Sequence, residues 1–117
     1  MRQVGWMFNA AIVLLGLGMV VSSVEGGGGN LDSGKVIYEK HCLACHGTQG
    51  KGDTPIGKVL HPQPLDFASV VVKTKTDADL LTIIQNGVKG TAMTGWKSTL
   101  SEQEMLDVLA YIRAFTK

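Results

Sequence analysis

The sequence has little excess of charge of either sign. Its 11 lysine and arginine residues are balanced by 10 aspartate and glutamate residues, which leaves a formal net charge of +1 over 117 residues. A protein that binds nucleic acid usually carries a clear basic surplus, so the composition argues against a nucleic-acid partner. The length suits one small domain, and a second domain does not fit.

Cysteine is nearly absent as well. Cys42 and Cys45 are the only two, and His46 follows them directly. A disulfide across a C-x-x-C loop closes too few residues to stabilise a fold. The remaining roles are a redox dithiol, part of a metal site, or covalent haem attachment. A redox dithiol needs a βαβ setting, and zinc bound with the help of His41 or His61 lacks the usual second ligand pair. The adjacent histidine favours haem attachment, because two thiols at this spacing can each bond one vinyl group while the imidazole reaches the iron.

Charged residues are also scarce near the N-terminus. Residues 6–24 are almost wholly apolar, and Arg2 precedes them. The run suits an export signal and just reaches the roughly 20 residues that span a bilayer. We therefore expect residues 1–25 to be a signal peptide or a membrane anchor, and residues 26–30 to be a glycine-rich linker. Either form places the domain of residues 31–117 in the periplasm, or otherwise outside the cytoplasmic membrane.

Three stretches carry helix signals. The first helix is expected to begin near Asp32 or Ser33 and to end about Cys42, with Val36 and Ile37 available for packing.

The other two helices have stronger signals. The second is expected from Thr76 to Asn86, with Asp79 completing a capping-box variant and Gly87 supplying a left-handed cap. The third follows Ser101 and a full capping box. Its apolar residues recur at helical spacing: Met105, Val108, Leu109 and Ile112.

Glycine and proline concentrate in residues 47–75, which show little sustained periodicity. Val70–Val72 suit a short strand, but the chain offers no second strand to pair with it. A loop of this length is uncommon in a compact domain unless it wraps something. We therefore expect an all-α fold with extended loops around a cofactor.

Met93 is the candidate for a second axial ligand. It lies between the second and third helices, where glycines on both sides let the backbone approach a flat cofactor. Thioether sulfur raises the potential of a His-ligated iron, and Met105 is already explained by its apolar helix face. His61 is the competing ligand, because His41 is too close to the attachment site to reach the far face.

These motifs together resemble the class I (mono-haem) cytochrome c family over residues 30–117. The matching segments are GKVIYEKHCLACHGTQGKGD, HPQPLDF, DADLLTIIQNGVKG, TAMTGW and AYIRAF. The resemblance implies three main helices and long loops wrapped around one covalently bound haem c with its iron. It implies that Cys42 and Cys45 attach the haem, with His46 as proximal and Met93 as distal ligand.

The resemblance has further implications for packing. The first and third helices should cross, which would bring Gly34 and Tyr38 near Leu109 and Tyr111. The carbonyl of a proline should accept a hydrogen bond from the proximal imidazole, and Pro62 and Pro64 are both available. Trp96 should pack on the haem, bond a propionate, or belong to the core.

The expected function is electron transfer between redox partner proteins, without catalytic groups and hence without enzyme activity. One alternative is a haem enzyme or gas sensor with an opened distal site. Another is a fixed cytochrome subunit, or a tethered module, of a larger membrane respiratory complex. Lysines around an exposed haem edge would attract an acidic partner. The candidates are Lys51, Lys58, Lys73, Lys75, Lys89 and Lys97, whereas Glu102, Glu104 and Asp107 lie on the last helix.

Overall fold

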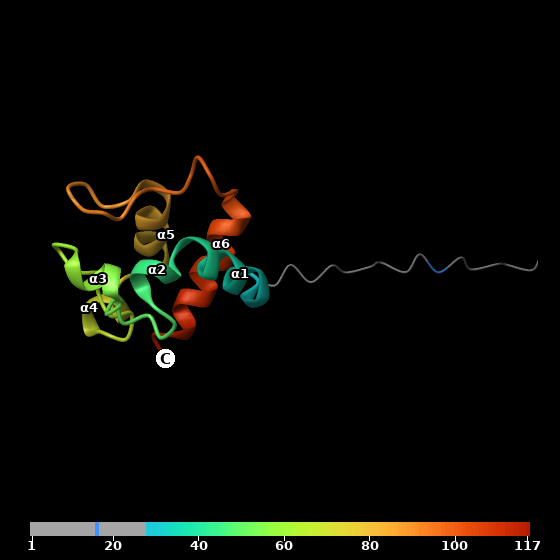
Figure 1. Cartoon of the computed structure of the whole chain (residues 1–117). Helices are drawn as coiled ribbons and strands as arrows, with labels where there is room; N and C mark the ends of the chain where they lie inside the picture. Colours follow the sequence, from blue (N-terminus) through green and yellow to red (C-terminus); the bar gives the residue numbers. More distant parts are fainter. Residues whose placement is uncertain (1–15, 17–27) are drawn as a thin grey trace, which may run out of the picture.

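The computed structural model describes residue 16 and residues 28–117 of the chain. The helices are α1 (Leu31–His41), α2 (Leu43–His46), α3 (Pro55–Val59), α4 (Val70–Lys73), α5 (Asp77–Asn86) and α6 (Glu102–Ala114) (Figure 1). These residues form no strand, and their one isolated β-bridge joins Gly87 to Thr94. The all-α prediction is confirmed for this part of the chain.

The predicted export or anchor segment, residues 1–25, lies outside the described residues except for residue 16. Within the part that is described, no helix is both long enough and apolar enough to cross a membrane.

The three long helices are the ones predicted from the sequence. Helices α5 and α6 begin after the capping boxes of Thr76 and Ser101, as expected. Helix α1 begins earlier than predicted, because its N-cap is Asn30, whose side chain accepts a hydrogen bond from the Ser33 N–H at 2.9 Å. Gly87 ends α5 with φ 70° and ψ −169°, which is a glycine conformation but not the left-handed helical cap expected.

The long segment before α5 is more ordered than predicted. It contains α3, which starts at Pro55, and α4, which includes the run Val70–Val72 that suited a strand but lacked a partner strand. Ser69 caps α4, because its side-chain hydroxyl accepts a hydrogen bond from the Val72 N–H. The apolar run Val70–Val72 thus forms a helical turn and needs no partner strand.

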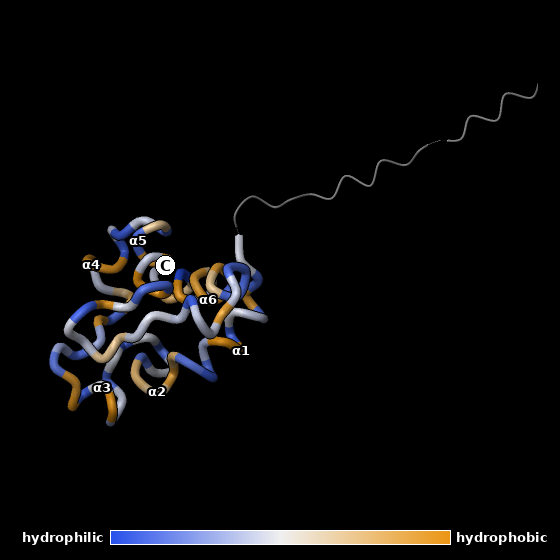
Figure 2. Tube along the Cα trace, turned by 90° about the horizontal axis from the view of Figure 1, so that it is seen from above, coloured by the Kyte–Doolittle hydropathy of each residue, from blue (hydrophilic) through white to orange (hydrophobic). Residues whose placement is uncertain are grey.

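Helices α1 and α6 lie side by side in both views (Figures 1 and 2). A side chain at Gly34 would overlap the carbonyl oxygen of Asp107, so the close approach requires glycine there. The Tyr38 and Tyr111 rings are 5.2 Å apart between centroids, and Leu109 is buried. The predicted crossing is confirmed.

The faces of these helices correct one expectation. Val36 is 66 % exposed and does not pack, whereas its neighbour Ile37 is buried. Asp107 lies on the last helix, as expected, and is only 5 % exposed. Its Oδ1 accepts hydrogen bonds from the Asn30 N–H at 2.7 Å and from Gln103 at 2.9 Å. Burial alone would raise the Asp107 pKa, but these bonds and one from Ser33 outweigh it and lower the pKa.

The core combines the three long helices with α4 and with residues of the loops. Its buried apolar members are Ile37, Tyr38, Phe67, Val72, Leu80, Ile84, Leu100, Met105, Val108, Leu109 and Ile112. All four residues predicted for the apolar face of α6 are among them.

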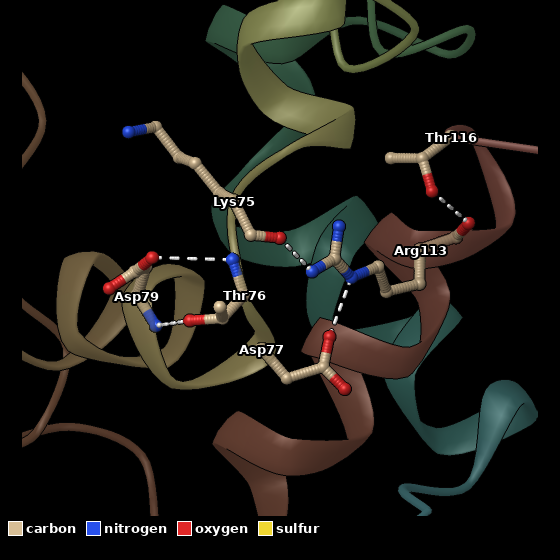
Figure 3. A network of polar contacts seen from close by, with 6 residues as sticks. All are labelled: Lys75, Thr76, Asp77, Asp79, Arg113 and Thr116. Atoms are coloured by element: carbon tan, nitrogen blue, oxygen red, sulfur yellow. Dashed lines mark hydrogen bonds and ion pairs between the residues drawn. The ribbon is translucent and has the colours of Figure 1, made fainter.

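The start of α5 is joined to the end of α6 by Arg113 (Figure 3). Its Nε donates to Asp77 at 2.6 Å, and its Nη2 donates to the Lys75 carbonyl at 2.5 Å. An exposed ion pair alone contributes little, but the second bond fixes the backbone that enters α5. Helix α5 thereby keeps its place beside the cavity described next.

Candidate functional site

A cavity of about 430 Å³ lies between α2, α5, α6 and the connecting loops. That volume is typical of a small-molecule site. Much of the wall is apolar and comes from the core faces of α5 and α6, namely Leu80, Ile83, Ile84, Val108 and Ile112. Four further residues of the wall are those predicted to hold a cofactor: Cys42, Cys45, His46 and Met93.

The two cysteines reach the cavity from a tight turn between helices. Cys42 follows α1 directly, and Cys45 belongs to the four-residue helix α2. The His46 N–H donates to the Cys42 carbonyl at 2.9 Å, which closes this turn. Both thiols are free and half-buried. Burial, and then the neighbouring Cys45, raise the pKa of Cys42 to about 11, so its thiol is protonated at neutral pH.

His46 presents a neutral imidazole. Burial lowers its pKa, because a low-dielectric environment disfavours the imidazolium ion. Its Nδ1 is buried and has no hydrogen-bond partner among the described residues. Pro62 and Pro64 both line the cavity, but neither carbonyl accepts a bond from His46, so this expectation is not met. The ring instead stacks on Phe67, with centroids 4.7 Å apart and an interplanar angle of 19°.

The backbone around His46 is held by hydrogen bonds from both sides. The buried Tyr38 hydroxyl of α1 donates to the Gly47 carbonyl at 2.7 Å. The Gly52 N–H donates to the His46 carbonyl at 2.9 Å. The Thr54 hydroxyl donates to the Ala44 carbonyl at 2.6 Å. The turn that carries Cys42, Cys45 and His46 is therefore fixed by residues that precede it and residues that follow it.

Met93 is placed on the wall by a short hairpin. The Val88 N–H donates to the Met93 carbonyl at 3.0 Å, and the Met93 N–H donates to the Thr91 hydroxyl at 3.2 Å. A side chain at Gly87 would overlap the Met93 carbonyl, which explains the glycine. The Trp96 N–H then donates to the Ile84 carbonyl at 2.8 Å, which joins the loop to α5.

The competing residues lie elsewhere. His61 is exposed and does not line the cavity. Met105 is 2 % exposed and belongs to the core, as its helical spacing predicted.

Sequence reasoning missed the position of His41. It lines the cavity beside Trp96, with ring centroids 4.8 Å apart. Its place next to Cys42 at the end of α1 was the available signal. Trp96 itself is half-buried; it lines the cavity and packs against the hydrophobic core.

The lysines give a mixed result. Lys75 lines the cavity. The other five candidates are exposed and do not line it: Lys51, Lys58, Lys73, Lys89 and Lys97.

The other cysteine chemistries lack support. Across the described ranges, no three His, Cys, Asp or Glu side chains are grouped so that they could hold a metal ion. The same residues contain no strand, so there is no βαβ unit for a redox dithiol. A haem fits the donor set, because the cavity lining includes the imidazole of His46, the thioether of Met93 and the two thiols that directly precede His46 in sequence.

Comparison with known families and proteins agrees with this chemistry. Residues 29–112 match the family described as cytochrome c oxidase, cbb3-type, subunit III. The cbb3-type cytochrome c oxidase subunit CcoP of Azospirillum brasilense is 26 % identical over 83 residues, which are 69 % of this chain and 27 % of that protein. Cytochrome c-554(548) of Halomonas halodenitrificans is 31 % identical over 70 residues, which are 60 % of this chain and 78 % of that protein.

Solved structures are similar as well. The c-type cytochrome KustC0563 matches with a TM-score of 0.63 and 26 % identity, over 72 % of this chain and 98 % of its own. A reducing HAO-like protein complex of Kuenenia stuttgartiensis matches with a TM-score of 0.64 and 28 % identity, over 74 % of this chain and 42 % of that one. The chain therefore spans less than half the length of CcoP and of the matched K. stuttgartiensis chain, and almost the whole length of KustC0563.

Proposed function

Because this chain belongs to the family described as cytochrome c oxidase, cbb3-type, subunit III, and so to the class I cytochromes c with their covalent haem c and iron, we propose that it carries single electrons with a His/Met-ligated haem. Cys42 and Cys45 are the proposed attachment sites. His46 is the proposed proximal ligand, and Met93 the distal one. The observation that carries the proposal is that all four side chains line one largely apolar cavity.

The bound haem supplies a one-electron iron couple, and the chain's own residues set the conditions for it. The neutral His46 imidazole is ready to donate to a metal without losing a proton. The apolar side chains of α5 and α6 exclude water from the cavity, and such a hydrophobic shell tunes the redox potential. Met93, which lines the same cavity, would supply the second protein ligand to the iron.

The cavity wall also supports a carrier over a haem enzyme. Among the described residues, no aspartate or glutamate lines the cavity. A peroxide-handling site needs acid–base groups beside the open axial position. Apart from the proposed haem-binding residues, the titratable side chains of the wall are His41, which lies against Trp96, and Lys75.

A second candidate is a fixed cytochrome unit of a larger redox assembly. Two relatives favour it, since the A. brasilense protein is named as an oxidase subunit and the K. stuttgartiensis structure is a protein complex. The residues that hold the haem would be the same, and the electron donor and acceptor would be neighbouring subunits.

The carrier proposal predicts one covalent haem per chain in the native protein. Haem stain should stay on the band in denaturing electrophoresis, and the intact mass should exceed that of the processed chain by one haem. The ferrous protein should titrate as a single reversible one-electron centre and should not bind carbon monoxide readily. A protein that holds zinc without haem would contradict the proposal.

We also propose that the domain works outside the cytoplasmic membrane, with residues 1–25 as a cleaved signal or a retained anchor. N-terminal sequencing of the native protein distinguishes the two forms. A start between Val24 and Gly27 indicates a soluble carrier, and an intact Met1 in the membrane fraction indicates a tethered one. An intact Met1 in the soluble cytoplasmic fraction would overturn the proposal.

A further inference from the structure

The His46 ring has one close planar neighbour. The Phe67 ring lies nearly parallel to it, 4.7 Å away between centroids and tilted by 19°. Phe67 is 8 % exposed, and both side chains line the cavity. Rotation of a histidine ring about its Cβ–Cγ bond is a soft torsion with a broad minimum. Nδ1 is bonded to no described protein group, and the nearly parallel Phe67 face is an aromatic contact that opposes this rotation.

Phe67 is itself unable to move far. Its N–H donates to the Gly50 carbonyl at 2.9 Å. Gly50 has φ 67°, and a Cβ there would lie 2.6 Å from Phe67 Cδ2, so the ring rests directly on this glycine. Tyr38 meets the ring edge-on at 6.4 Å, and Phe115 lies 5.9 Å away. A ring packed on several sides presents a fixed surface to the imidazole.

We propose that Phe67 is a positioning residue that sets the plane of the His46 imidazole by stacking. This inference rests on the proposed role of His46 as an axial ligand. Groups around a metal commonly orient its histidine ligands through hydrogen bonds. Here the aromatic face of Phe67 orients the ring. Phe67 in turn contacts the aromatic cluster of Tyr38 and Phe115, from α1 and the end of α6.

The orientation of an axial imidazole can be measured. Its π orbital overlaps differently with the iron d orbitals at each ring angle, which changes how unpaired spin is distributed over the ferric haem. The order and spread of the four hyperfine-shifted haem-methyl signals in proton NMR therefore report this angle. Loss of packing alone does not reorder them.

The test compares ferric holoprotein variants. Phe67→Leu removes the planar face and is expected to change the order or spread of the haem-methyl signals. Phe67→Tyr keeps the face and is expected to preserve the wild-type pattern. Phe115→Leu is the matched control, since the Phe115 ring packs against Phe67 at a tilt and is not stacked on His46. It should lower the thermal midpoint while the order of the signals stays unchanged.

Phe67→Met is the second variant, for use if Phe67→Leu does not accumulate as folded holoprotein. Its flexible side chain fills the volume without a planar face, so the order or spread of the haem-methyl signals should change here too. The sulfur-to-iron charge-transfer band should persist in every variant, which assigns the altered pattern to His46. An unchanged pattern in both Phe67→Leu and Phe67→Met would overturn the inference, as would an equal change in Phe115→Leu. A wild-type protein without hyperfine-shifted haem-methyl signals would instead reject the proposed function, and this inference with it.

Discussion

Replacing both Cys42 and Cys45 with alanine is expected to abolish covalent haem attachment completely. Both thiols line the cavity, and neither is bonded to the other. Each thioether forms when a thiol S–H adds across one vinyl group, so without the thiols no covalent bond to the haem is possible. The haem stain should disappear from the band in denaturing electrophoresis, and the intact mass should fall to that of the polypeptide.

The same double variant should also lose stability. Without a ligand, the apolar wall of the roughly 430 Å³ cavity would lose its packing partner and face water, which is unfavourable. A small domain has only about 5–15 kcal/mol of stability in total. We therefore expect weaker helical circular dichroism and a broad thermal transition unless haem binds without covalent bonds.

The single variants Cys42→Ala and Cys45→Ala are the matched controls. Each leaves one thiol, and some haem stain should remain on the band. A double variant that still carries covalent haem would show that the attachment lies elsewhere.

Replacing Met93 with alanine is expected to convert the carrier into a protein with an open iron. The variant should lose the weak near-infrared sulfur-to-iron charge-transfer band of the ferric protein. Its reduction potential should fall by about a few tenths of a volt, within the roughly 0.8 V range that axial ligands control. The ferrous variant should bind carbon monoxide. Visible and near-infrared spectroscopy with a redox titration measures all three effects.

Two substitutions serve as controls for this experiment. His61→Ala changes an exposed residue that does not line the cavity, so the spectrum should stay as in the wild type. Met105→Leu removes a thioether from the core at nearly constant volume and should keep the band. If His61→Ala removes the band and Met93→Ala does not, the distal ligand has been misassigned.

The local features of this protein could be predicted from its sequence. The capping boxes at Thr76 and Ser101 depend on hydrogen bonds that span three residues, so their pattern is visible in the chain itself. The apolar face of α6 follows from helical periodicity. The grouping of Cys42, Cys45 and His46 is equally local, and chemistry limits what such a group can bind.

Only the tertiary structure decided the features that depend on distant residues. Helix α1 starts at Leu31 beside Asp107, whose carboxylate accepts the Asn30 N–H across 77 positions of sequence. His41 became part of the cavity because it meets Trp96, and Phe67 faces His46 because Gly50 supports its ring. Such contacts leave no periodic pattern, because each one joins segments whose approach is determined by packing of the whole core.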